Sequence, residues 1–387
     1  MNTNDAILTI NYGSSSLKIA LFDMTVEPLK KILTFSVIND VLIVKNEDHK
    51  VLDEQKNLPQ SLAKTIKKIL DWINKNNSSY SLRAVGHRIV HGGNRYLKTT
   101  LLHDVVVRDL ENFIPLAPLH QGYNLMPISI IKTLYPQLPQ FACFDTSFHV
   151  TQSKELKIFG LPRRYYDQGI YRYGFHGLSF AAVLEKLPVD LKNKRVIIAH
   201  LGSGASLAAI KDSQSVYTTT GFSALEGLLM GTRCGTVDPG VLLYLLEEKK
   251  MSLKDLKHLL YEESGLLGLS GISSDMKVLL ESVSPDANEA IQVYVHRILQ
   301  YIGSMMVFLK GLDVIVFTAG VGENAPQIRK KIIQGLSWYG VSLDDETNDK
   351  NQEMLISDKK STVKIMIIKT DEEKIIAEEV LQSLALV

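Results

Sequence analysis

Short apolar runs of strand length alternate along the chain with longer stretches whose apolar residues are spaced as on one face of a helix. The strand-like runs are 7–22, 32–45, 83–90, 140–144, 195–210 and 313–318. The helical stretches are 59–75, 124–134, 178–187, 252–261, 285–310 and 372–384. Because a mixture of this kind forms sheets covered by helices, the pattern predicts an α/β protein.

One arrangement occurs twice: an apolar strand, a turn of glycine and serine, and a second apolar strand. The copies are residues 8–22 and 196–210, and they align His200 with Asn11. Such a repeat indicates a duplicated domain, with each copy contributing one turn to a shared cleft between domains. A chance similarity between two hairpins is the alternative.

The length of 387 residues also favours two domains, because it exceeds the usual size of one hydrophobic core. The polar and aromatic run 152–173 has the character of a crossing between domains. We expect the first domain to comprise residues 1–148 together with a returning C-terminal helix in 374–387. The second domain is then residues 149–373.

Composition and charge exclude several classes of function. A net charge of +1 provides no general field for nucleic acid or an anionic membrane. The N-terminus lacks a signal-peptide pattern, and the most apolar window, 305–322, is interrupted by Lys310 and Asp313. We therefore expect a cytoplasmic protein with no membrane span. Cys143 and Cys234 are too few for a disulfide framework or a zinc site.

The first glycine-serine turn has the residues of a phosphate-binding loop. Gly13 lets backbone N–H groups approach an anion closely, and the hydroxyls of Ser14–Ser16 add donors. Asn11 can reach a metal-bound water, and Lys18 supplies positive charge. The segment predicts a nucleotide or acyl-phosphate site. The alternative is a hairpin whose serines satisfy their own turn.

A third glycine segment, residues 319–324, follows an apolar strand and precedes the helical run from Pro326. Its glycines either pack under a nucleotide or only make the turn from strand to helix. The sequence leaves both interpretations open.

Two arginines stand beside glycines in otherwise apolar segments. Arg88 lies in Gly-His-Arg-Ile-Val-His-Gly-Gly at 86–93, and Arg233 lies in Leu-Met-Gly-Thr-Arg-Cys-Gly at 229–235. A guanidinium holds a carboxylate or a transferring phosphate in a fork, and two of them neutralise charge on a phosphoryl group in flight. The alternative for Arg88 is a structural salt bridge.

Several acids and histidines are further candidates. Asp145 ends an apolar strand, where it either faces a metal or caps a turn. Glu372 and Glu373 open the last helix, where they either hold magnesium or favour the helix N-terminus. His120 and His176 are candidate hydrogen-bond donors to a phosphate, since no spacing indicates zinc.

These segments resemble the motifs of the acetokinase family, in the superfamily of acetate and sugar kinases, heat-shock chaperones and actin. Two of the matching motifs are Asn-x-Gly-Ser-Ser-Ser-x-Lys at 11–18 and Arg-Tyr-Gly-Phe-His-Gly at 172–177. Further similar segments are 86–93, 117–120, 144–149, 225–233 and 317–324. The resemblance runs through nearly the whole chain.

The resemblance implies a two-domain, duplicated ribonuclease H-like fold, as in the actin-like ATPases, with the active site in the interdomain cleft. The first domain would bind the acyl substrate and phosphate, and the second domain the nucleotide. The implied reaction is reversible transfer of the ATP γ-phosphate to acetate, giving acetyl phosphate and ADP, with Mg²⁺ or Mn²⁺. The resemblance also implies a homodimer.

The same resemblance assigns roles to individual residues. The implied catalytic residues are Arg88, Asp145, His176 and Arg233. The implied metal-placing residues are Asn11 and Glu372. The implied nucleotide and phosphate ligands are Ser14, Ser16, Lys18, His200, Gly202, Gly204, Asp275, Lys277, Gly320, Gly322 and Asn324. The implied contacts of the acyl substrate are Arg88, Val90, Leu119, His120, Phe175 and Ala224.

Several positions depart from the family pattern. They are Gln121, Gly122, Leu178, Phe180, Ser203, Tyr217, Ala224 and Lys277. Ala224 stands where a proline usually closes the acyl pocket, so we expect propionate to be accepted nearly as well as acetate. A sugar or glycerol kinase is a second interpretation, but the paired arginines favour a carboxylate acceptor. A non-catalytic ATP-binding member is a third.

Overall fold

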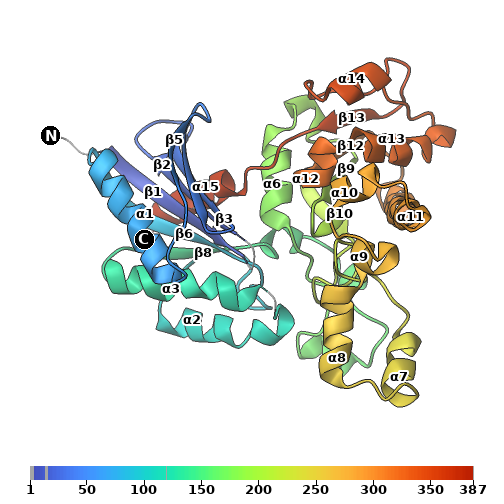
Figure 1. The fold of residues 1–387 in the computed structure, drawn as a ribbon, viewed down its shortest axis with the longest axis horizontal. Coiled ribbons are helices and arrows are strands. Elements are labelled where there is room, and N and C mark those ends of the chain that lie inside the picture. Colours follow the sequence, from blue (N-terminus) through green and yellow to red (C-terminus); the bar gives the residue numbers. More distant parts are fainter. Residues whose placement is uncertain (1–3, 14–15, 119, 387) are drawn as a thin grey trace. The chain divides into compact units, whose positions relative to one another are not determined.

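The structure is a computed structural model that describes residues 4–13, 16–118 and 120–386. By its contacts the chain separates into two units (Figure 1). The first unit is residues 1–147 with 371–387, and the second unit is residues 148–370. The chain therefore passes between the units twice, after residue 147 and after residue 370.

The first unit is built on an eight-stranded sheet of order β5-β4-β3-β2-β1-β6-β8-β7. Its strands are β1 (Asn4–Tyr12), β2 (Leu17–Asp23), β3 (Lys30–Ile38), β4 (Val41–Asn46), β5 (Val51–Gln55), β6 (Tyr80–Ile89), β7 (Thr100–Leu101) and β8 (Gln140–Phe144). β1 pairs antiparallel with β2 and parallel with β6, and β6 pairs parallel with β8. β1, β6 and β8 therefore run in the same direction, and their carboxyl ends lie at the same end of the sheet.

Helices cover both faces of this sheet. They are α1 (Leu62–Asn76), α2 (Asp104–Glu111), α3 (Gln121–Leu134) and α15 (Glu372–Leu384). Ile66 and Ile69 of α1 join Leu8 of β1 in one buried cluster. α15, red in Figure 1, lies among the blue strands, and a β-carbon built on Gly86 of β6 would lie 2.5 Å from its Ile376. The end of the chain thus packs on its first strands.

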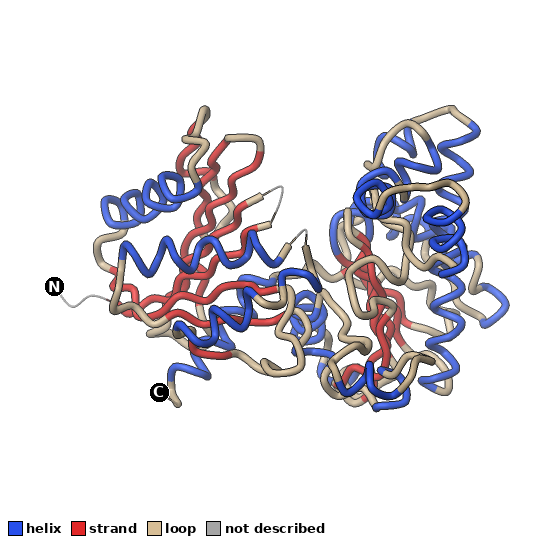
Figure 2. Tube along the Cα trace, turned by 90° about the horizontal axis from the view of Figure 1, so that it is seen from below, coloured by secondary structure: helices blue, strands red, loops and turns tan. Residues whose placement is uncertain are grey.

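The second unit has a five-stranded sheet of order β11-β10-β9-β12-β13. The strands are β9 (Val196–Leu201), β10 (Ala205–Lys211), β11 (Gln214–Thr218), β12 (Val314–Thr318) and β13 (Lys364–Ile367). Val196 and Ile198 pack toward α6 (Gly177–Lys186), whereas Ile197 and Ala199 join the cluster of α11 (Pro285–Leu309). Because successive strand residues face opposite sides, one apolar strand serves two helical layers. Figure 2 shows the strands of each unit between helices.

The other helices of the second unit are shorter. They are α4 (Lys154–Lys157), α5 (Arg163–Asp167), α7 (Pro239–Glu247), α8 (Leu253–His258), α9 (Gly265–Ser270), α10 (Met276–Glu281), α12 (Ala319–Asn324), α13 (Pro326–Gln334) and α14 (Asp345–Lys350). A turn of π-helix, Leu259–Glu263, follows α8. Among the described residues, the structure has no helix with the length and apolar character needed to cross a membrane.

The two sheets repeat one plan. β3-β2-β1-β6-β8 and β11-β10-β9-β12-β13 have the same order, with two antiparallel pairings followed by two parallel pairings. Each glycine-serine turn connects the last paired residues of its hairpin. These are Tyr12 and Leu17 in the first unit, and Leu201 and Ala205 in the second. The α/β class and the duplication predicted from the repeated hairpin are therefore confirmed.

The structure also adds elements that the sequence pattern missed. The run 32–45 is a hairpin of two strands, β3 and β4, and β5, β7, β11, β13, α2 and α7 were not predicted. The hairpin predicted at 196–210 is confirmed as β9 and β10. Cys143 is buried in β8 and Cys234 is half-buried, and both are free thiols.

Candidate active site

In the first unit, charged side chains gather where β6 and β8 end. Arg88 lies one residue before the end of β6, and Asp145 directly follows β8. Arg88 Nη2 lies 2.7 Å from Asp145 Oδ2, and Arg88 Nε lies 3.2 Å from both carboxylate oxygens. A fork of this kind fixes the plane of the guanidinium.

The remaining guanidinium nitrogen of Arg88, Nη1, contacts one residue from near each end of the chain. Its Nη1 lies 3.2 Å from Glu372 Oε2, at the start of α15, and 3.3 Å from Asn11 Oδ1, near the end of β1. Burial alone lowers the pKa of Arg88, but Asp145 and Glu372 outweigh it and raise the pKa overall. Arg88 is therefore a permanent cation.

The acids beside Asn11 have the donor types that a hard cation prefers. Asn11 Nδ2 donates to Glu372 Oε2 at 3.0 Å and to Glu373 Oε1 at 3.5 Å. Mg²⁺ is usually bound through one or two carboxylates together with substrate phosphates and water. Over the described residues no group of three or more His, Cys, Asp or Glu could hold a metal ion by itself. The residues fit Mg²⁺ that arrives with a phosphate.

In the second unit, a cation and two imidazoles surround the turn between β9 and β10. A β-carbon built on Gly204 would lie 2.6 Å from Arg233 Nη2 and 3.4 Å from His176 Nε2. One built on Gly202 would lie 3.7 Å from His200 Nε2. At Gly204 only glycine leaves room for the Arg233 side chain, whereas a β-carbon on Gly202 would make an ordinary contact with His200.

Serine hydroxyls orient both imidazoles. Ser206 Oγ lies 2.8 Å from Nδ1 of His176, and Ser179 Oγ lies 2.8 Å from Nδ1 of His200. The rings stack with centroids 4.2 Å apart. His176 has a φ of 58°, which is uncommon outside glycine and is held by the surrounding structure. The Nε2 edges of both rings are thereby set beside the glycine turn.

Arg233 has a different environment from Arg88. Its Nη1 donates to the carbonyl of Ala224 at 2.9 Å. Burial lowers its pKa, and the titratable neighbours that act against this effect are Tyr261 and Cys234 rather than carboxylates. At neutral pH Arg233 still carries a charge, because the pKa of arginine starts far above that range.

The predicted phosphate ligands of the first hairpin are only partly placed. Ser14 lies outside the described residues. Gly13 N–H donates to the backbone carbonyl of Ser16 at 3.0 Å, and this bond leaves the role of the serine hydroxyls untested. Lys18 lies in β2 with an exposed side chain, and Ser16 is half-buried. Their contact with a phosphate stays a prediction.

The third glycine segment forms α12, not an open loop. Glu323 Oε1 accepts from the backbone N–H of Ala319 at 2.9 Å, and Asn324 Nδ2 donates to the Gly320 carbonyl. A β-carbon on Gly322 would lie 3.4 Å from the backbone of Phe317. These residues make the turn from strand to helix, and their nucleotide role stays a prediction.

Asp275 and Lys277 are also engaged locally. Asp275 caps α10, because its Oδ1 accepts from the Lys277 N–H at 2.9 Å. Both side chains are exposed, so a nucleotide could still reach them.

The predicted acyl contacts are divided between the units. Val90 is buried in the first unit, where its N–H donates to Asn124 Oδ1, and His120 is the N-cap residue before α3. Phe175 is buried in the second unit, and Ala224 is half-buried there. Leu119 lies outside the described residues.

Sequence reasoning missed the residues that hold the candidates in place. Ser179 and Ser206 orient the histidines, and Asn124 bridges Val90 and the Tyr12 carbonyl. Gln121, noted only as a departure, bonds the backbone of His91 at 3.1 and 3.0 Å. Ser206 occupies the place in the second hairpin that Lys18 has in the first, which is the signal that could have identified it.

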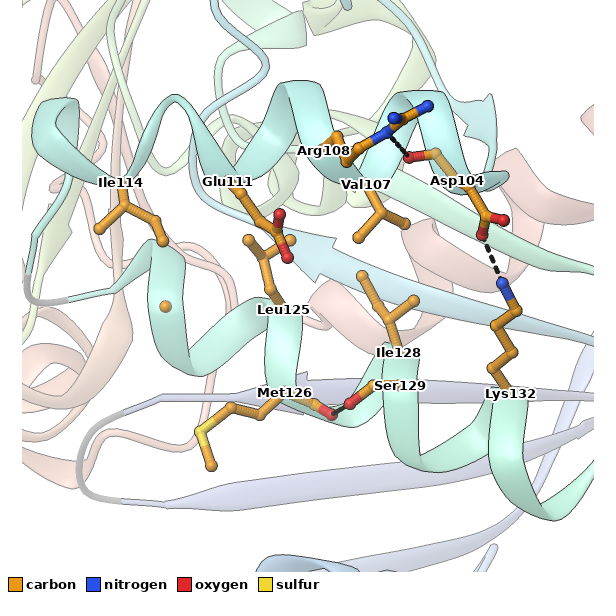
Figure 3. Close-up of a pocket in the computed structure, with 11 residues that line it drawn as sticks. Asp104, Val107, Arg108, Glu111, Ile114, Leu125, Met126, Ile128, Ser129 and Lys132 are labelled. Atoms are coloured by element: carbon orange, nitrogen blue, oxygen red, sulfur yellow. Dashed lines mark hydrogen bonds and ion pairs between the residues drawn. The ribbon is translucent and has the colours of Figure 1, made fainter.

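A groove of about 760 Å³ between α2 and α3 holds none of these candidates. Val107 of α2 and Ile128 of α3 point toward each other across it, and Lys132 pairs with Asp104 at one end (Figure 3). Acidic and basic groups alternate along it, so its charge favours no single ligand.

Comparison with known proteins decides the family. The acetokinase family profile matches residues 6–378. The chain belongs to the acetokinase family. It is therefore a kinase enzyme, and the resemblance found in its motifs is confirmed. Acetate kinase of Rickettsia felis is 46% identical over 388 residues, which cover 98% of this chain and 100% of that protein. Acetate kinase of Methylocella silvestris is 42% identical over 394 residues, 97% of each chain.

Solved structures of family members have the same fold. A propionate kinase from Francisella tularensis superposes with a TM-score of 0.88 at 34% identity, covering 97% of this chain and 98% of that one. Acetate kinase of Porphyromonas gingivalis gives 0.86 at 33% identity, covering 98% and 100%. The actin-like, two-sheet α/β fold of acetokinases is thereby confirmed for this chain.

Proposed function

We propose that this acetokinase catalyses reversible, ATP-dependent phosphorylation of acetate to acetyl phosphate. The observation that supports this proposal most strongly is the grouping of Arg233, His176 and His200 around the Gly202–Gly204 turn. A guanidinium and imidazole N–H groups beside bare backbone suit the equatorial oxygens of a phosphoryl group in transfer.

The chemistry of the acceptor explains the arrangement around Arg88. A carboxylate is already ionised at neutral pH, so its oxygen attacks the γ-phosphorus directly and no base is needed. ADP leaves with the electron pair of the broken P–O bond. A sugar hydroxyl would need a general base to remove its proton. Asp145 is the carboxylate considered for that role, but it forms an ion pair with Arg88. The site therefore favours a carboxylate over a sugar.

The two units have separate tasks in this proposal. The first unit binds the carboxylate through Arg88, and the second unit binds the nucleotide and contributes Arg233 and His176 to the transfer. Asn11 and Glu372 would hold Mg²⁺, or Mn²⁺, which when bound neutralises charge on the ATP phosphates. Because ATP is made available in the cytoplasm, we place the reaction there.

We propose further that the enzyme is a homodimer. α7 has the sequence Pro-Gly-Val-Leu-Leu-Tyr-Leu-Leu-Glu, yet none of its residues is buried within this chain. Leu243 is 57% exposed and Tyr244 is 52% exposed. An apolar surface of this kind is typical of a protein interface, and a second copy of the chain is the occupant we propose.

The identity of the acid is tested by acyl phosphate formation with MgATP and acetate, propionate or butyrate, trapped as the hydroxamate. Because Ala224 is smaller than proline, we predict kcat/KM values for acetate and propionate within tenfold of each other. Ala224→Pro is the matched variant, and it should shift preference toward acetate. A hundredfold preference of the wild type for acetate would contradict the proposed role of Ala224.

The same assay separates the alternatives. Product with acetate or propionate supports the carboxylate kinase. Binding of ATP without product from any of the three acids would favour the non-catalytic interpretation instead.

A further inference from the structure

The segment 219–227, which follows β11, holds Arg233 by one of its carbonyls. Arg233 Nη1 donates to Ala224 O at 2.9 Å. Burial lowers its pKa, and among the described residues the groups that oppose this effect are Tyr261 and Cys234, not carboxylates. The direction of this guanidinium therefore depends on where the 219–227 segment places Ala224.

The same segment is joined to the residues that precede His176. Tyr173 N–H donates to Gly221 O at 3.0 Å, and Phe175 N–H donates to Thr220 Oγ1 at 3.0 Å. His176 follows directly and is the N-cap residue before α6. The two groups proposed to contact the transferring phosphoryl group thus belong to segments that are bonded to each other.

One ion pair ties these segments together. Arg172 Nη2 lies 2.6 Å from Glu226 Oε1, and Arg172 Nη1 donates to Thr220 O at 3.2 Å. The side chains are 12% and 30% exposed. Arg172 also lies over the ring of Tyr217, 5.6 Å from its centroid. Pairs that are partly buried and additionally hydrogen-bonded restrict geometry more than exposed pairs do.

The Arg172–Glu226 pair packs closely against the backbone of Gly221, in the middle of the 219–227 segment. A β-carbon built on Gly221 would lie 1.6 Å from Glu226 Oε2 and 3.3 Å from Arg172 Nη1. The carboxylate therefore rests on bare backbone, inside the bend that carries Ala224. The ion pair is therefore packed directly against this bend.

We propose that Arg172 and Glu226 are positioning residues for phosphoryl transfer, which act by holding the Ala224 carbonyl on Arg233 and the His176 segment beside it. Neither residue touches the reacting groups in this account. The inference rests on the proposed function and deepens it, because it assigns the orientation of the second arginine to an ion pair outside the site.

The test uses two conservative variants. Glu226→Gln removes the charge, and Arg172→Lys keeps the charge but removes the fork. The control pair is Arg195–Asp313, also in the second unit, with an Nη2 to Oδ1 distance of 2.6 Å and side chains 35% and 30% exposed. Arg195→Lys and Asp313→Asn report what loss of a comparable pair does to stability alone.

We expect Glu226→Gln and Arg172→Lys each to lower kcat at least tenfold, with KM for ATP and for the carboxylate within threefold of wild type. The control variants should show a similar change in melting temperature with kcat within twofold. The double variant should be no slower than the slower single variant, because the pair acts as a unit. A kcat within threefold of wild type in both single variants would overturn the inference.

A second cycle distinguishes positioning from general damage. Because Glu226 is proposed to act through Arg233, Arg233→Lys should cost several-fold less in kcat when Glu226→Gln is already present. If the effects of Glu226→Gln and Arg233→Lys on kcat multiply independently, the Arg172–Glu226 pair stabilises the fold and does not position Arg233. Wild-type turnover is measured alongside. Its absence would defeat the proposed function itself, whereas normal turnover with insensitive variants defeats this inference alone.

Discussion

At the scale of residues, the two arginines differ in how much of their charge is already balanced. Arg88 is shared between Asp145 and Glu372, which raise its pKa overall, so its contribution is mainly the fixed geometry of a fork. Arg233 is set beside a carbonyl and a glycine turn, with its pKa lowered by burial. An arginine without a carboxylate partner presents most of its field to an incoming anion, which suits a transferring phosphoryl group.

Two buried histidines predict how stability depends on pH. Burial lowers the pKa of His87 and of His149 from 6.5 to about 4. The unfolded chain therefore binds protons between pH 6.5 and 4 that the folded chain does not, so the free energy of unfolding falls as pH falls through this window. Each histidine contributes about 1.4 kcal/mol per pH unit within it.

The measurement is urea unfolding between pH 7.5 and 4.5 for the wild type and His149→Gln. The His149 ring bonds the Phe175 carbonyl through Nε2 at 3.0 Å, and a glutamine amide can make that bond without titrating. We expect the variant to lose some stability at pH 7.5 but to have a shallower pH dependence. An unchanged slope would show that His149 does not titrate in this window.

Residue types were predictable from the sequence, but not which bond each side chain makes. An aspartate before a helix has the same appearance whether it binds a ligand or caps the helix, and Asp275 does cap α10. Ser206 and Ser179 gave no signal as single serines, because their contacts with His176 and His200 join residues 30 and 21 positions apart. The glycine turns were easier to recognise, because glycine next to serine between two apolar strands indicates a tight turn whose backbone can approach an anion.

At the scale of elements, burial explains which ones the apolar pattern predicts. β1, β9 and β12 are buried throughout or nearly so, and each gives a continuous apolar run. β5, Val-Leu-Asp-Glu-Gln, lies at the sheet edge with most side chains exposed, so nothing in its pattern marks it as a strand. α12 was obscured because its glycines resemble a loop, while the Glu323 bond to Ala319 stabilises a helix.

α7 is an apolar helix, none of whose residues is buried within its own chain. If a second copy covers it, replacing Leu243 by glutamate places a charge in the interface, and we expect the dimer to dissociate. Light scattering should give twice 43.2 kDa for the wild type and 43.2 kDa for Leu243→Glu.

Val283→Glu is the control for this prediction, since Val283 is fully exposed in a loop of the same unit. That variant should stay dimeric. A monomeric wild type, or a Leu243→Glu variant with undiminished mass, would contradict the proposed interface.

At the scale of the whole molecule, duplication gives each unit the same order of five central strands, with different polar and charged groups where those strands end. Equivalent positions of the two hairpins carry Asn11 and His200, and Lys18 and Ser206. The repeated turn made this duplication visible in the sequence. The C-terminal helix was expected to return to the first unit, and the resemblance grouped Asn11 with Glu372. The contacts of Arg88 with both residues were not visible in the sequence, because they depend on the parallel pairing of β1 with β6.

The central claim is that one phosphoryl transfer to a carboxylate uses an arginine from each unit. The most direct measurement is the rate of acetyl phosphate formation from acetate and MgATP by the wild type, Arg88→Ala and Arg233→Ala, with Arg195→Ala as the control for loss of an arginine. We predict that both site variants lose at least a hundredfold in kcat/KM while the control stays within threefold of the wild type. Wild-type-like formation of acetyl phosphate by either Arg88→Ala or Arg233→Ala would contradict the account.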